Sequence, residues 1–325
     1  MRGPGYITPP RRPEGIRWLR SDGKPNFKDH IYRHEGDAKL IAKRPVYTVT
    51  KTATILGAAE EMTRHNVRAL PVVKPNTEIL EGMLTATDIV NYFGGGEYFK
   101  IIVNRHNGNL YHALLKEHVE SIMNPNPVYA TIYDRLDKIL ETMVLKNVGI
   151  LPVVMDDGSI WGIISEHDLV MMLAEKKIGR KVSEVMSRNV ITIDSRATLR
   201  EAAQTMIKYG IRRLPIIEDG RIWGMITAKD IVRFIGSHDV FRYVETGSVD
   251  EALAAPVKII GLSGYVTISP DADVGDAATL MKEKNVSSLL VVEDGELKGI
   301  ITERDVLYAV AAKPTEEAAA QERAP

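Results

Sequence analysis

GMITAKD, residues 224–230, follows an apolar, strand-like run and places Thr227 three residues before Asp230. Three other runs have the same form: GMLTATD (82–88), GIISEHD (162–168) and GIITERD (299–305). Similarity of this kind within one chain is the signature of a repeat architecture. The unit that contains these runs therefore decides the fold.

The four units share one order of predicted elements. In the third unit, the helical pattern LREAAQTMIKYGI (199–211) precedes the strand LPII (214–217), a turn, the strand that leads to Thr227, and the helix start DIVRFI (230–235). Apolar residues at i, i+3, i+4 and i+7 place one apolar stripe on such a helix. The predicted fold class is α+β, in units of strand, helix, strand, strand and helix. A unit of this size is too small to bury its apolar surface alone, so the units are expected to pair.

Matching insertions indicate the order of pairing. YFGGGEYFKII (92–102) follows the first unit and FIGSHDVFRYV (234–244) follows the third, whereas the second and fourth units lack an insertion. The pattern predicts a duplicated module of two units, and the short junction EKKIGRKVSE (175–184) predicts that the two modules pack together. The glycines of GGGEYF (94–99) lead out of a helix and are interpreted as a flexible linker. The predicted segments are a basic extension (1–36), module 1 (37–177, with its insertion at 94–122), module 2 (178–312, with its insertion at 236–261) and a disordered tail (313–325).

The Thr/Ser-x-x-Asp spacing has two interpretations. In the first, the hydroxyl and the carboxylate cap the first helical turn, which stabilises a protein by about 0.5–2 kcal/mol. In the second, the carboxylate accepts the ribose hydroxyls of a nucleoside, and a preceding cation such as Lys229 binds phosphate at the helix N-terminus. Arg68, Arg212 and Arg213 precede the middle strand in the first and third units only. They are interpreted either as phosphate ligands or as solvated helix ends.

The four runs, in register with LPVV-type strands, resemble CBS (cystathionine-beta-synthase) domains. The two pairs of units resemble tandem Bateman modules of the stand-alone type known from archaea and thermophiles. The resemblance covers residues 37–312 and implies pseudo-twofold modules packed as a disc, with adenine nucleotides (AMP, ADP or ATP) as regulatory ligands. The residues that it implies in ribose and phosphate binding are Thr85, Asp88, Ser165, His167, Asp168, Thr227, Lys229, Asp230, Thr302, Arg304 and Asp305, together with Arg68, Arg212 and Arg213.

Two units depart from this pattern. Thr87 stands where the other units have a cation before the Asp, so the first site is expected to be weak or to prefer an uncharged ligand. Ser287 stands in the fourth unit where the first and third have Arg, which weakens the expected phosphate contacts there. Trp161 and Trp223 occupy equivalent positions and are interpreted as packing residues, with base stacking as the alternative.

Composition and absent motifs exclude several function classes. The chain has no Cys, which excludes disulfides, cysteine-bound zinc and thiol catalysis. It has no GxxxxGK[ST], no GxGxxG after a strand and no HExxH, so a non-catalytic protein is expected. His30 and His34 lack an evident third ligand, and no metal is expected. No apolar run is long enough to span a membrane and the N-terminus is unlike a signal peptide, so we expect a cytoplasmic protein without membrane contact.

The macromolecular partner is expected to contact segments outside the repeats. Residues 1–36 hold eight Lys or Arg residues and four acidic residues, hence a charge of +4; since the chain total is −1, the rest carries −5. Cations among aromatic rings suit ribosomal RNA, and the insertion at 97–118 has the same character. The candidate nucleic-acid contacts are Arg11, Arg12, Arg17, Trp18, Arg20, Lys24 and Lys28. The alternatives are a strap packed along the disc, and control of an enzyme or transporter through protein contacts. A homodimer is compatible with either partner.

Overall fold

The computed structural model describes residues 36–311, in which the same α+β unit occurs four times. In each unit a short strand pairs in parallel with the first strand of an antiparallel hairpin, and one helix precedes the hairpin while another follows it. The hairpin has an irregularity in register at the same place in every unit. The predicted fold class and the four repeats are therefore confirmed.

Module 1 comprises the first two units and the insertion between them. The first unit and the insertion contain α1 (Asp37–Ile41), β1 (Val49–Thr50), α2 (Ile55–Arg64), β2 (Ala69–Val73), β3 (Leu80–Thr85), α3 (Ala86–Val90), the π-helical turn η2 (Asn91–Gly95), α4 (Phe99–His106), α5 (Leu110–Leu115) and the 3-10 turn η3 (Val119–Ser121). The second unit contains β4 (Ala130–Thr131), α6 (Leu136–Lys146), β5 (Ile150–Val154), β6 (Ile160–Ser165) and α7 (Glu166–Met171).

Module 2 repeats this order. The third unit and its insertion contain α8 (Val182–Val185), β7 (Ile193–Asp194), α9 (Leu199–Tyr209), β8 (Arg213–Glu218), β9 (Arg221–Thr227), α10 (Ala228–Gly236), the 3-10 turn η4 (Asp239–Tyr243), α11 (Val249–Leu253) and α12 (Val257–Ile260). The fourth unit contains β10 (Leu262–Ser263), β11 (Thr267–Ile268), α13 (Val274–Lys284), β12 (Ser288–Glu293), β13 (Glu296–Thr302) and α14 (Glu303–Ala311).

Within each module, a linker of each unit pairs through its backbone with the hairpin of the neighbouring unit. Lys43, in the linker before β1, bridges Ile163 on β6, and Asn124, in the linker before β4, bridges Met83 on β3. Likewise, β10 pairs with β9 of the third unit, and Ser187, in the linker before β7, bridges Ile300 on β13 of the fourth. The first residue of each quoted run is a glycine at this crossing: a Cβ there would clash with the linker atoms of the neighbouring unit. These glycines are Gly82, Gly162, Gly224 and Gly299.

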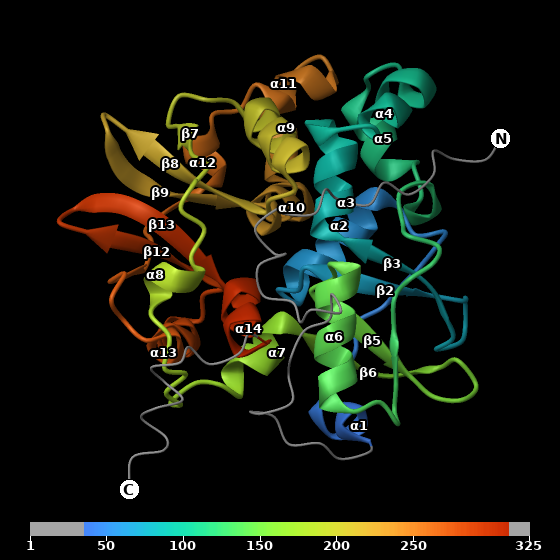
Figure 1. Cartoon of the computed structure of the whole chain (residues 1–325). Coiled ribbons are helices and arrows are strands. Elements are labelled where there is room, and N and C mark those ends of the chain that lie inside the picture. The colour runs from blue at the N-terminus through green and yellow to red at the C-terminus, as the bar shows by residue number, and fades with distance from the viewer. Residues whose placement is uncertain (1–35, 312–325) are drawn as a thin grey trace, which may run out of the picture.

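The two modules pack through their helices. Figure 1 shows the hairpins β8–β9 and β12–β13 of module 2 on one side and those of module 1 on the other, with helices between them. One apolar cluster joins the first unit to the third, with α2 against α10, and a second cluster joins the second unit to the fourth, with α7 against α14. At Gly236 on α10, a Cβ would clash with the carbonyl oxygen of Ala59 on α2, so these two helices meet backbone to backbone.

The interpretation of GGGEYF as a flexible linker is wrong. Gly94 is buried and lies inside the turn η2, with a positive φ of 145° that favours glycine. A Cβ on Gly95 would stand 2.5 Å from Ile207 Cγ1 and 2.8 Å from the Ala203 carbonyl oxygen, both on α9. The glycines therefore allow the first unit to approach α9 of the third closely, which the local sequence does not reveal.

Candidate ligand site between the four units

All four Thr/Ser–Asp pairs form helix caps. In the third unit, the Thr227 backbone N–H donates to Asp230 Oδ2 at 2.8 Å and the Thr227 hydroxyl donates to the same oxygen at 2.7 Å. The pairs Thr85–Asp88, Ser165–Asp168 and Thr302–Asp305 repeat both contacts. One carboxylate oxygen of each Asp is therefore used by the cap, and a ligand would have to approach the other.

The surroundings of the other oxygen differ between the units. Asp168 Oδ1 lies 2.7 Å from Lys43 Nζ, and Asp230 Oδ1 lies 2.8 Å from a guanidinium nitrogen of Arg233. Among residues 36–311, no cation forms an ion pair with Asp88. Burial therefore raises the pKa of Asp88 to about 7, although the hydrogen bonds from Thr85 oppose the rise. The first site thus differs from the second and third in charge.

The predicted phosphate ligands converge from all four units. Arg68 of the first unit lies 3.2 Å from a Glu303 oxygen, and His167 of the second lies 2.7 Å from the other oxygen of Glu303. Arg212 of the third unit and Arg304 of the fourth contact the two oxygens of Glu166 at 3.2 and 2.5 Å. The structure therefore gathers these four residues around Glu166 and Glu303, and we call the six residues the central ion cluster.

Two further predicted cations make contacts close to this cluster. The Lys229 ammonium group donates to the backbone carbonyl of Asn66 at 3.1 Å, which links the third unit to the first. Arg213 donates to the Ser287 carbonyl oxygen at 2.5 Å, within module 2. Burial and the nearby Arg68 lower the pKa of Lys229. Ser287, noted as a departure from the repeat, thus meets Arg213 through its backbone.

Sequence reasoning missed Glu166 and Glu303. Their side chains are only 2% exposed and lie at the first positions of α7 and α14. Burial alone would raise the pKa of Glu166, but Arg304, Arg212 and Arg68 outweigh it and lower that pKa to about 2. The available signal was the residue after each Thr or Ser: the second and fourth units have Glu there, and the first and third have Ala.

The cluster remains rich in positive charge despite these two carboxylates. Burial, followed by the repulsion from Arg68, lowers the pKa of Arg212 to about 9, and the attraction of Glu166 offsets this only in part. Arg68 itself is shared, since it also lies 3.6 Å from Glu166. A buried group of cations with few anions is the kind of site that accepts phosphate.

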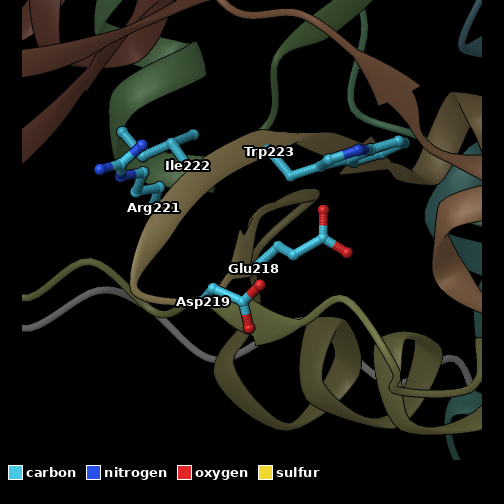
Figure 2. A pocket seen from close by; sticks show the side chains of 5 residues that line it. All are labelled: Glu218, Asp219, Arg221, Ile222 and Trp223. Atoms are coloured by element: carbon cyan, nitrogen blue, oxygen red, sulfur yellow. The ribbon is translucent and has the colours of Figure 1, made fainter.

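Each of the two tryptophans lies against a cation of its own module. Arg44 stands 4.6 Å from the ring centre of Trp161, and Lys258 stands 5.0 Å from that of Trp223. A pocket of about 440 Å³ lies at the β8–β9 hairpin. Figure 2 shows its lining side chains, with the Glu218 carboxylate near the Trp223 ring. Its lining residues are Glu218, Asp219, Arg221, Ile222 and Trp223, and none of them belongs to the central ion cluster.

The candidate nucleic-acid segments have different positions. Arg11, Arg12, Arg17, Trp18, Arg20, Lys24 and Lys28 lie outside the described residues. In the insertion, Arg105 and His106 both contact Glu117, at 3.1 and 2.8 Å, and Tyr98 is buried. The insertion therefore has fewer free cations and rings than its sequence indicated.

The described part of the chain shows neither a metal-binding cluster nor a membrane-spanning helix. No group of three or more His, Asp or Glu side chains within residues 36–311 is arranged to hold a metal ion. Over the same range, no helix combines the length and the apolar character needed to cross a bilayer.

The repeats identify the family. The CBS domain family matches residues 38–95, 119–175, 182–237 and 261–312, and the chain therefore belongs to the CBS-domain proteins, with two tandem Bateman modules. A Thermofilum pendens protein, named as an uncharacterized 33.4 kDa protein in a ribosomal RNA operon, is 32% identical over 263 residues, which cover 81% of this chain and 87% of the relative.

Two solved structures have the same fold over most of the chain. The Methanocaldococcus jannaschii protein MJ1225, described as a candidate archaeal homologue of g-AMPK, is 32% identical, with a TM-score of 0.77 over 82% of this chain and 97% of that protein. In sequence, MJ1225 matches 271 residues of this chain. An uncharacterized Pyrococcus horikoshii protein is 19% identical, with a TM-score of 0.51 over 86% of this chain and all of its own, which shows the fold alone.

Proposed function

We propose that this CBS-domain protein is a non-catalytic regulator that binds adenine nucleotides where its four units meet. The observation that carries the proposal is the convergence of Arg68, His167, Arg212 and Arg304, one from each unit, at the central ion cluster, beside helix starts that each carry a Thr/Ser–Asp cap. Ribose hydroxyls suit the second oxygen of each Asp, and phosphate suits the cations at helix N-termini.

The nucleotide would act by changing the affinity for a macromolecular partner. A ligand shifts a conformational equilibrium only if it binds the two states unequally. Because the cluster contains contacts between modules, a ligand bound there would alter how strongly the modules hold one another. We propose that the protein senses cellular energy status in this way, and the 32% identity to MJ1225, described as a candidate homologue of g-AMPK, supports this role.

Calorimetry with the full chain tests the proposal. Adenosine, AMP, ADP and ATP are titrated into the protein, and at least one of them is expected to bind. Asp230→Ala is expected to weaken binding at the third unit. Glu201→Ala is the matched control, because Glu201 caps α9 together with Thr198 but lies outside the cluster. Absence of binding heat for every adenine compound, with folded protein, would refute the proposal.

The second candidate function is regulation of translation through RNA or the ribosome. The observation that favours it is the Thermofilum pendens relative, whose name places it in a ribosomal RNA operon. The basic extension at 1–36, with its charge of +4, supplies the chemistry for phosphate contacts. A salt titration of ribosome binding, with and without residues 1–36, tests this function, and retained binding after truncation would remove the extension as the contact. Binding of a regulated protein instead would favour a regulatory subunit.

A further inference from the structure

The two buried glutamates of the central ion cluster are not explained by the caps beside them. In the second unit, Ser165 and Asp168 cap α7 without help from Glu166. The first and third units carry Ala86 and Ala228 at the equivalent position and have the same caps. Burying a carboxylate is costly unless cations and hydrogen bonds compensate it. The ion pairs, and not the helix start, therefore account for Glu166 and Glu303.

Both carboxylates take up donors that a phosphate would need. Arg304 and Arg212 each direct a guanidinium N–H group at Glu166, and Arg68 directs one at Glu303. Carboxylate and phosphate use the same N–H groups of the planar guanidinium fork. A phosphate that entered the cluster would also be repelled by the two carboxylates, since like charges in a poorly solvated site disfavour one another. The glutamates and a ligand phosphate would thus exclude one another.

We propose that Glu166 and Glu303 are specificity-determining residues that stand in for phosphate in the ligand-free protein and compete with the phosphate groups of the ligand for Arg68, Arg212 and Arg304. This inference rests on the proposed function. It implies that the glutamates reduce the preference for highly phosphorylated adenine nucleotides, because every added phosphate must displace or oppose a carboxylate already held by the same arginines.

The competition would also change the ion pairs that link the two modules. Glu166 belongs to module 1, whereas Arg212 and Arg304 belong to module 2. Glu303 belongs to module 2, whereas Arg68 and His167 belong to module 1. Replacement of either carboxylate by a ligand phosphate therefore exchanges a direct ion pair between modules for a bridge through the ligand.

Calorimetry on Glu166→Gln tests the competition. Glutamine has nearly the same shape and still accepts hydrogen bonds, but it lacks the charge. The ratio of the ATP to the adenosine association constant is expected to rise by about tenfold or more, the scale of one charge-assisted hydrogen bond. The double variant Glu166→Gln with Arg212→Gln removes one charge of each sign and is expected to bring the ratio back toward the wild-type value. An unchanged or lower ratio in Glu166→Gln would overturn the inference.

Two further outcomes are separable. If no adenine compound binds either protein, the proposed function has failed, and the inference with it; if adenosine binds but the ratio is unmoved, only the inference has failed. Where Glu166→Gln or Glu303→Gln does not fold alone, refolding is repeated with inorganic phosphate. Recovery of the fold in phosphate, and not in an equal concentration of chloride, is expected if the carboxylates replace phosphate. Failure to recover would count against it.

Discussion

Asp88→Asn is expected to make the protein more stable at neutral and alkaline pH. The pKa of Asp88 rises from 3.8 to about 7 because its carboxyl group is buried, with 5% exposure, and forms no ion pair within the described residues. Between these two values the folded state binds a proton that the unfolded state has released, so the free energy of unfolding falls as pH rises. At 1.36 kcal/mol for each pKa unit, the loss reaches about 4 kcal/mol above pH 7.

Urea unfolding from pH 4 to pH 8 measures this effect as the difference between the wild type and Asp88→Asn. The difference is expected to be small near pH 4, where both side chains are neutral, and to grow to about 4 kcal/mol in favour of the variant above pH 7. Asp230→Asn is the matched control, because Asp230 has the same cap and burial but contacts Arg233 at 2.8 Å. It is expected to destabilise. A difference for Asp88→Asn that does not vary with pH would refute this reasoning.

Four other substitutions give three independent tests. Gly236→Ala forces α10 away from the Ala59 carbonyl oxygen on α2, so the free energy of unfolding is expected to drop by about 1–3 kcal/mol, measured by urea unfolding. Thr227→Ala and Thr198→Ala each remove a cap hydroxyl and are expected to cost about 0.5–2 kcal/mol; calorimetry should show weaker nucleotide binding only for Thr227→Ala, and equal weakening would contradict a ligand role at α10. Glu166 stabilises the fold above pH 4.5, and this contribution is lost as pH falls toward its folded pKa of about 2. In Glu166→Gln, the free energy of unfolding measured by urea is therefore expected to decrease less between pH 4.5 and pH 2 than in the wild type. An equal decrease in both proteins would contradict the ion pairs.

The fold could be predicted from the sequence because its decisive contacts are local and repeated. A Thr or Ser and an Asp three residues apart can cap only the helix that begins between them, and four copies in register define the repeating unit. The glycines that begin the four runs were equally visible. What they allow, the passage of a linker from the neighbouring unit, could be seen only in three dimensions.

The centre of the molecule was less predictable, since its partners lie far apart in the chain. Arg304 and Glu166 meet across 138 residues, and no local spacing predicts such a pair. The cations were recognised because they recur beside the caps, but their carboxylate partners occupy positions that a helix start tolerates for many residue types. Gly95 was misread for the same reason, because the atoms that require a glycine there belong to α9.

The exchange of linkers between neighbouring units sets the smallest fragment that can fold. In a single unit cut from the chain, the hairpin would lose the linker that pairs with its outer strand. The unit's own linker would also lose the strand with which it pairs, so two sets of backbone groups would be unpaired. A pair closes both edges but leaves bare the helices that face the other pair. An isolated module is therefore expected to associate with a second copy of itself, which is the arrangement from which a gene encoding one pair could give rise to a chain with two.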